Sequence, residues 1–118
     1  MKLVGSLTEQ YFREELSKSW DGLREQGNEL LPILQDRLGL IDSAFVMNWT
    51  PEQGEDLYTI IVNGVDVVCL EVLRDIGELV AFETTSVKHY ERSLCSRQHR
   101  IKLAVALDLA RGLKSNPG

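Results

Sequence analysis

The first 40 residues carry apolar side chains at helical intervals. Ser6 and Glu9 have the spacing of a capping box, in which each side chain accepts a hydrogen bond from the backbone N–H of the other residue. Apolar residues then recur every three or four positions, and Gly27 marks a stop. A second apolar series has Pro32 in its first turn and ends at Gly39. This part of the chain is therefore expected to form two amphipathic helices.

After the second helix the apolar period changes to two, which predicts strands. Four segments show it: residues 44–49, 57–62, 65–73 and 79–85. Asn63–Gly64 is the strongest short hairpin signal, because a type I′ turn requires positive φ at both central positions. Asp75–Gly77 indicates a three-residue turn between the last two strands. Short turns between consecutive strands favour a four-stranded antiparallel meander.

The C-terminal part returns to helical spacing. Ser86 is expected to cap a helix that extends through Leu94, and Ser96 is expected to cap a second one over residues 98–113. The centre of the second helix, residues 101–110, is apolar nearly all round, which is typical of a helix buried on more than one side.

The chain as a whole is predicted to be a single α+β domain with N-terminal helices, a four-stranded antiparallel meander sheet and C-terminal helices. Its length of 118 residues is close to the usual size of one domain. We expect the domain to span residues 1–114. Residues 115–118 include Pro117 and are expected to form a flexible tail, because they cannot continue a helix.

The two turns set an expected register for the sheet. A two-residue loop at 63–64 pairs Asp56 with Glu71, and a three-residue loop at 75–77 pairs Glu71 with Ala81. In this register five carboxylates gather at one end of the sheet and form a candidate partner-binding cluster. They are Glu52, Glu55, Asp56, Glu71 and Glu83. One sheet face is then apolar, and the other is mixed, so it is either partly covered by a helix or an interaction surface.

Charge is unevenly distributed along this acidic chain, whose net charge is −5. Residues 41–87 hold nine acidic side chains and one basic side chain, Arg74, whereas residues 88–118 hold seven basic and two acidic ones. Such segregation bears on the choice of partner and on the rate of encounter. Two readings remain open: the carboxylate cluster faces a cationic partner, or Arg97 or Arg100 neutralises it within the chain.

The sequence contains only weak evidence for a catalytic site. Clustered carboxylates hold Mg²⁺ in many phosphodiesterases, so one alternative is a metal-dependent nuclease that uses Asp56 and Glu71. The order of elements resembles that of restriction-endonuclease-like nucleases, but those need Glu-x-Lys, and Leu73 stands where the Lys belongs. Cys95 and His99 lack the third group that orients a nucleophilic pair. We therefore expect neither an enzyme nor a metal or other cofactor.

Other features of the sequence indicate the cellular location of the protein and the partners that it does not contact. No run of about 18 apolar residues predicts a membrane helix, and residues 1–10 lack the apolar region of a secretory signal. The two cysteines, Cys69 and Cys95, are too few for a disulfide framework. A pI near 5.0 disfavours direct nucleic-acid binding. A cytoplasmic protein without membrane or nucleic-acid contacts is expected.

Three stretches carry a family resemblance: residues 1–6, residues 49–60 (WTPEQGEDLYTI) and residues 101–110 (IKLAVALDLA). They are similar to small bacterial proteins encoded beside secreted toxins, of which the best known resemble the immunity proteins of contact-dependent growth inhibition systems. The resemblance implies a protein that binds and neutralises a cognate toxin, commonly a nuclease acting on tRNA or DNA, and it assigns no residue roles. The remaining alternative is a general interaction module or homodimer that uses the mixed sheet face.

Overall fold

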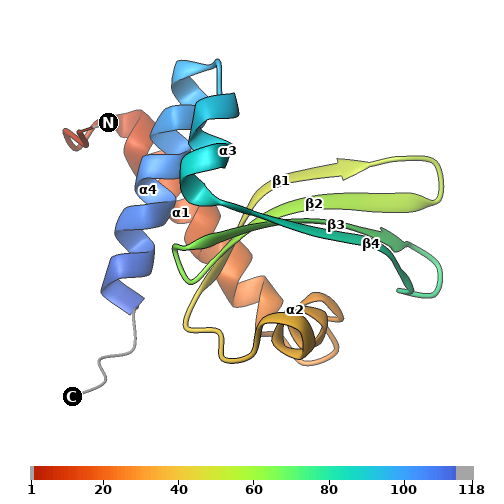
Figure 1. Ribbon diagram of the computed structural model, residues 1–118. Coiled ribbons are helices and arrows are strands. Elements are labelled where there is room, and N and C mark those ends of the chain that lie inside the picture. The colour runs from red at the N-terminus through yellow and green to blue at the C-terminus, as the bar shows by residue number, and fades with distance from the viewer. Residues whose placement is uncertain (1, 114–118) are drawn as a thin grey trace.

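A computed structural model describes residues 2–113 of the chain (Figure 1). Two helices, four strands and two further helices follow one another, as the sequence predicts. They are α1 (Leu7–Leu23), α2 (Leu30–Leu38), β1 (Ala44–Pro51), β2 (Glu55–Val62), β3 (Asp66–Leu73), β4 (Leu79–Ser86), α3 (Val87–Ser93) and α4 (Arg97–Leu113). The strands form one antiparallel sheet in the order β1-β2-β3-β4, so the predicted α+β meander is confirmed. The expected tail, residues 115–118, lies outside the described residues.

The helices occupy one end of the molecule and one face of the sheet (Figure 1). Helices α1 and α4 pack against each other and against β1, and α3 contacts β3 and β4. Helix α2 lies along the sheet, where the guanidinium of Arg37 stacks 5.2 Å from the ring centre of Phe82. The β1–β2 loop and the β3–β4 turn project at the other end, away from α3 and α4. We call this end of the sheet the free end.

The predicted capping box begins α1. The hydroxyl of Ser6 accepts a hydrogen bond from the N–H of Glu9 at 3.2 Å, and the buried Glu9 carboxylate accepts from the N–H of Ser6 at 3.1 Å. The same carboxylate accepts from the N–H groups of Val4 and Gly5. Burial raises the pKa of Glu9, but the hydrogen bonds from Ser6, Gly5 and Val4 outweigh it and lower the pKa to about 2. Glu9 therefore holds the N-terminal segment onto the helix as a carboxylate.

The predicted β2–β3 turn forms, but its loop is one residue longer than expected. Asn63 and Gly64 have φ values of 57° and 67°, as a type I′ turn requires. Val65 then stands outside the ladder, so that Val62 pairs with Asp66 and not with Val65. The carbonyl of Val65 instead accepts a hydrogen bond from the first residue of α3, at 3.2 Å. This connection to α3 explains the extra residue.

The extra residue makes the predicted β2–β3 register wrong by one position. Asp56 pairs with Val72, and Leu57 pairs with Glu71. Because side chains alternate along a strand, a shift by one residue moves each β2 side chain to the opposite face relative to β3. The predicted β3–β4 register, with Glu71 opposite Ala81, is correct.

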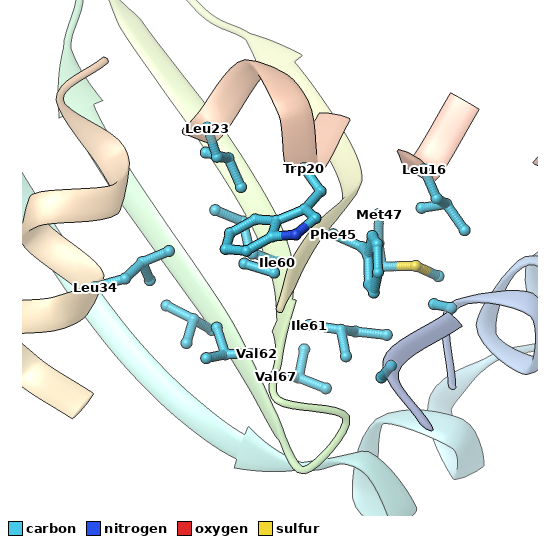
Figure 2. Close-up of a cluster of buried hydrophobic side chains, with 14 of the residues drawn as sticks. Leu16, Trp20, Leu23, Leu34, Phe45, Met47, Ile60, Ile61, Val62 and Val67 are labelled. Carbon is cyan, nitrogen blue, oxygen red and sulfur yellow. The ribbon is translucent and has the colours of Figure 1, made fainter. Parts of the chain in front are cut away.

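The two faces of the central strands differ in burial. We call the first the α2 face; its buried residues are Asp56, Ile60, Val62, Val68, Leu70 and Val72. We call the second the glutamate face; on β2 and β3 it holds Glu55, Leu57, Thr59, Ile61, Val67, Cys69, Glu71 and Leu73. In Figure 2, Leu34 of α2 lies on the side of Val62, whereas Ile61 and Val67 point toward α4. On the central strands, the helices thus cover the α2 face as far as Val72 but only the inner half of the glutamate face.

Helical side chains also cover the outer edge of β1. The N–H of Val46 donates to the Ser19 hydroxyl at 3.0 Å, and the Lys102 ammonium donates to the carbonyl of Met47 at 2.8 Å. A register shift between Val46 and Asn48 leaves Met47 as an extra residue, which is buried. This part of the edge is therefore satisfied by α1 and α4 and is not open to another strand.

Candidate binding surface

The outer half of the glutamate face is open. Close to α1 and α4, Ile61 and Val67 are fully buried. Toward the free end, Thr59 and Glu71 are only half-buried, and Cys69 is exposed although it lies in a central strand. A central strand shows an exposed side chain only where nothing packs on that face. Within residues 2–113, the sheet therefore presents an uncovered surface here.

Three glutamates cross this open surface on adjacent strands. Glu55 in β2 is opposite Leu73, which is two residues after Glu71 in β3. Glu71 in turn is opposite Ala81, which is two residues before Glu83 in β4. Each glutamate is thus the diagonal neighbour of the next, a separation of about 7–8 Å between Cα atoms in antiparallel sheets. We call these three residues the glutamate diagonal.

The carboxylates of the glutamate diagonal form no ion pair within the described residues. None of the ion pairs formed among residues 2–113 includes Glu55, Glu71 or Glu83. The basic C-terminal segment forms its ion pairs with α1 instead, through Lys102 with Glu15 and Asp108 with Arg13. Neither Arg97 nor Arg100 neutralises the acidic cluster, because the described ion pairs of residues 88–113 involve other residues.

Asp56, another of the five predicted site residues, does not lie on this surface. It lies on the α2 face opposite Val72, so its expected position beside Glu71 is wrong. Its Oδ1 accepts hydrogen bonds from Arg74 Nε at 3.2 Å, Arg74 Nη2 at 3.1 Å and Trp49 Nε1 at 3.2 Å. The hydrogen bonds from Arg74 outweigh burial and lower the pKa of Asp56, and the bond from Trp49 lowers it further. The carboxylate is therefore satisfied within the chain.

Arg74 also fixes the β1–β2 loop. Its Nη2 donates to the carbonyl oxygens of Glu52 and Glu55 at 2.9 and 3.1 Å, and its backbone N–H donates to the carbonyl of Gly54 at 3.0 Å. These bonds use carbonyl oxygens and leave the glutamate carboxylates of the loop without an ion pair among the residues described. Arg74 thus orders the backbone of the loop, while the Glu52 side chain is exposed.

The nuclease alternative required Asp56 and Glu71 to share a metal ion. Because they lie on opposite faces of the sheet, this pair does not form such a site. Across residues 2–113, no group of three or more His, Cys, Asp and Glu side chains is arranged to hold a metal ion. The carboxylates of the glutamate diagonal are spread across three strands and do not converge on one point.

Sequence reasoning missed part of the free end. A Cβ atom on Gly77, in the β3–β4 turn, would lie 1.7 Å from Oε2 of Glu29, so the Glu29 carboxylate at the start of α2 packs against this turn. No local pattern reveals this contact, because it joins segments far apart in sequence. The turn adds two exposed carboxylates, Asp75 and Glu78, which the acidic composition of the segment did indicate. Trp49, a large aromatic residue of β1, is 57% exposed.

Comparisons of the chain with protein-family models, with curated proteins and with solved structures found no significant match. No helix within residues 2–113 is long and apolar enough to cross a membrane. The geometry of the open sheet face is therefore the basis for inferring a function.

Proposed function

We propose that the protein binds a basic protein through the outer half of the glutamate face, and that it is an immunity protein that neutralises a cognate toxin. The glutamate diagonal carries this proposal. Like charges that are directly opposite on a sheet destabilise it, and like charges at diagonal positions repel each other more weakly. A Lys or Arg side chain of a partner that lies between Glu55 and Glu71, or between Glu71 and Glu83, relieves this repulsion, so the repulsion that weakens the fold favours binding.

Further carboxylates extend the negative surface over the free end. Glu52 lies in the β1–β2 loop, Asp75 and Glu78 lie in the β3–β4 turn, and Glu29 packs beside that turn. A surface of one sign speeds the encounter with a partner of the opposite sign. A nuclease toxin is cationic where it binds phosphates, so an acidic protein that covers this region competes with the nucleic acid.

The free end is also held rigid before any partner arrives. Trp49 is exposed, yet its N–H is bound to Asp56, which in turn is bound to Arg74. Trp49 pairs with Tyr58 and so lies on the α2 face, not on the proposed binding surface. Its hydrogen bond orders the free end, and a segment that is already ordered loses less entropy on binding. The hydrogen bonds of Arg74 to the loop have the same effect on the backbone that carries Glu52.

The test starts from the gene neighbourhood: a toxin-sized reading frame beside this one supplies the partner for a binding and inhibition assay, and its absence argues against the immunity role. Replacing the diagonal by Glu55→Gln, Glu71→Gln and Glu83→Gln should weaken binding about tenfold or more at low salt, mainly through slower association. A matched variant carries Glu14→Gln, Glu25→Gln and Asp36→Asn, which remove the same charge from exposed positions outside the sheet. It should bind nearly as well as the unmodified protein.

Two results would argue against the proposal. Equal loss of affinity in both triple variants would mean that only net charge matters and that the open sheet face is not the interface. Failure of the unmodified protein to inhibit the adjacent toxin domain, despite correct folding of both, would reject the immunity role.

A further inference from the structure

A groove of about 970 Å³ lies on the helical part of the molecule, between the N-terminal segment, α3 and α4. None of its residues belongs to the glutamate face. Four of its lining side chains are cationic: Lys88, Arg92, Arg100 and Arg111. The groove thus presents the opposite charge from that of the free end of the sheet.

One side of the groove is a continuous stripe of α4. Arg100 and Arg111 stand at its two ends, and Leu103, Ala104 and Leu107 lie between them. These positions are three or four residues apart, so they share one face of the helix. At a rise of 1.5 Å per residue, the two arginines are about 16 Å apart along the axis. The stripe therefore has an apolar centre with a cation at each end.

The opposite side comes from α3. Lys88 and Arg92 are one helical turn apart, and neither takes part in the ion pairs formed by residues 2–113. Two acidic side chains also line the groove. Asp108 is already neutralised by Arg13 at 2.9 Å, which leaves Glu91 as the second acid. The groove is positive overall. Arg100 and Arg111 donate to the backbone carbonyls of Leu94 and Leu107, whereas Lys88 and Arg92 form no ion pair within the described residues.

We propose that this groove binds an acidic peptide segment with an apolar centre, supplied by a partner protein. The apolar part of the α4 stripe accepts aliphatic side chains, and the cations at the ends and on α3 bind carboxylates. A length of about 16 Å accommodates roughly five residues of extended peptide. This site uses none of the residues of the open sheet face, so it does not depend on the proposed function.

A peptide fits the groove better than a nucleic acid does. None of the described residues that line it is aromatic, so no side chain offers a platform for base stacking. The apolar stripe of α4 has no counterpart on a phosphate backbone, whereas the aliphatic side chains of a peptide match it.

The test measures fluorescence anisotropy of a short labelled peptide that has leucine and alanine between pairs of glutamates. We expect saturable binding with one peptide per chain, and about tenfold weaker binding to the variant with Lys88→Gln and Arg92→Gln. The matched control carries Lys18→Gln and Arg97→Gln, which remove the same charge from exposed positions outside the groove lining. It should keep the affinity of the unmodified protein.

Several results would overturn this inference. Absence of saturable binding rejects the site. Equally weakened peptide binding in both double variants would mean that only the net charge of the protein matters, which also rejects it. Unchanged affinity for a peptide with glutamine in place of glutamate rejects the role of the cations. Tighter binding of an oligothymidylate, lost in the same groove variant, identifies a nucleic-acid site instead.

Discussion

The carboxylates on the two faces of the sheet differ in whether they have partners within the chain. On the α2 face, Asp56 is buried and accepts hydrogen bonds from Arg74 and Trp49. On the glutamate face, Glu71 lies one pair further along the same two strands, and its carboxylate forms neither an ion pair nor a hydrogen bond within residues 2–113. Both residues belong to one acidic segment. The face on which a side chain lies decides whether its charge stabilises the fold or remains available to a partner.

Apolar residues show the same contrast. The central strands bury every aliphatic side chain of the α2 face, down to Val72 near the free end. On the glutamate face, burial is complete at Ile61 and Val67 but only partial at Leu57. A protein that needed this sheet only as a scaffold gains stability by covering both faces. An uncovered half of one face is typical of a surface that has another use.

The largest expected effect compares one substitution on both faces. Leu70→Ala removes a side chain that is 1% exposed on the α2 face and should cost about 2–5 kcal/mol of unfolding free energy. Leu57→Ala removes a half-buried side chain from the glutamate face and should cost less than about 1 kcal/mol. Urea unfolding of both variants provides the measurement. Similar losses would mean that the glutamate face is packed as tightly as the other.

The next effect concerns the pH dependence of stability. The pKa of Asp56 lies below its ordinary value of 3.8 in the folded protein, so its ionisation stabilises the fold above that pH. Asp56→Asn should therefore be less stable than the unmodified protein at neutral pH. The difference should vanish as the pH falls from about 3.8 through the lower folded-state pKa. Glu9, whose pKa is also lowered, is present in both proteins and cancels in the comparison.

Glu71→Gln is the control for this prediction. It removes a carboxylate from the same end of the same strands but without a cationic partner, so its stability relative to the unmodified protein should not follow that pH profile. Unfolding curves measured from neutral pH to below pH 3.8 test both variants. A pH profile shared by the two would mean that the Asp56–Arg74 pair has no special role.

The order of elements was predictable because its signals are local. The capping box of Ser6 and Glu9 and the positive φ values at Asn63 and Gly64 depend on residues next to one another in sequence. The β2–β3 register was not predictable in this way. It depends on Val65, whose carbonyl is used by the start of α3, a segment that is distant in the chain.

The one-residue error in the predicted β2–β3 register determined which predicted site residues were placed on the correct face. Glu71 and Glu83 were placed on one face because the β3–β4 register was right, and Glu55 joins them there. Asp56 was placed wrongly because a shift by one residue reverses the faces of β2. The sequence did contain one hint. Arg74 is the only basic residue in an otherwise acidic segment, but its partner becomes evident only when the correct register is known.

The smallest expected effect tests the meaning of the glutamate diagonal directly. The variant with Glu55→Gln, Glu71→Gln and Glu83→Gln removes like charges from neighbouring positions, so its unfolding free energy should rise by about 0.2–1 kcal/mol. The gain should shrink at high salt, because the screening length falls to about 3 Å at 1 M. The control with Glu14→Gln, Glu25→Gln and Asp36→Asn should change less, since those carboxylates are not neighbours on a sheet.

A rise in stability together with a loss of affinity is the behaviour of an interface, because the same repulsion that opposes folding favours a cationic partner. A fall in stability would instead mean that the three carboxylates hold the fold together, and the binding surface would have to lie elsewhere.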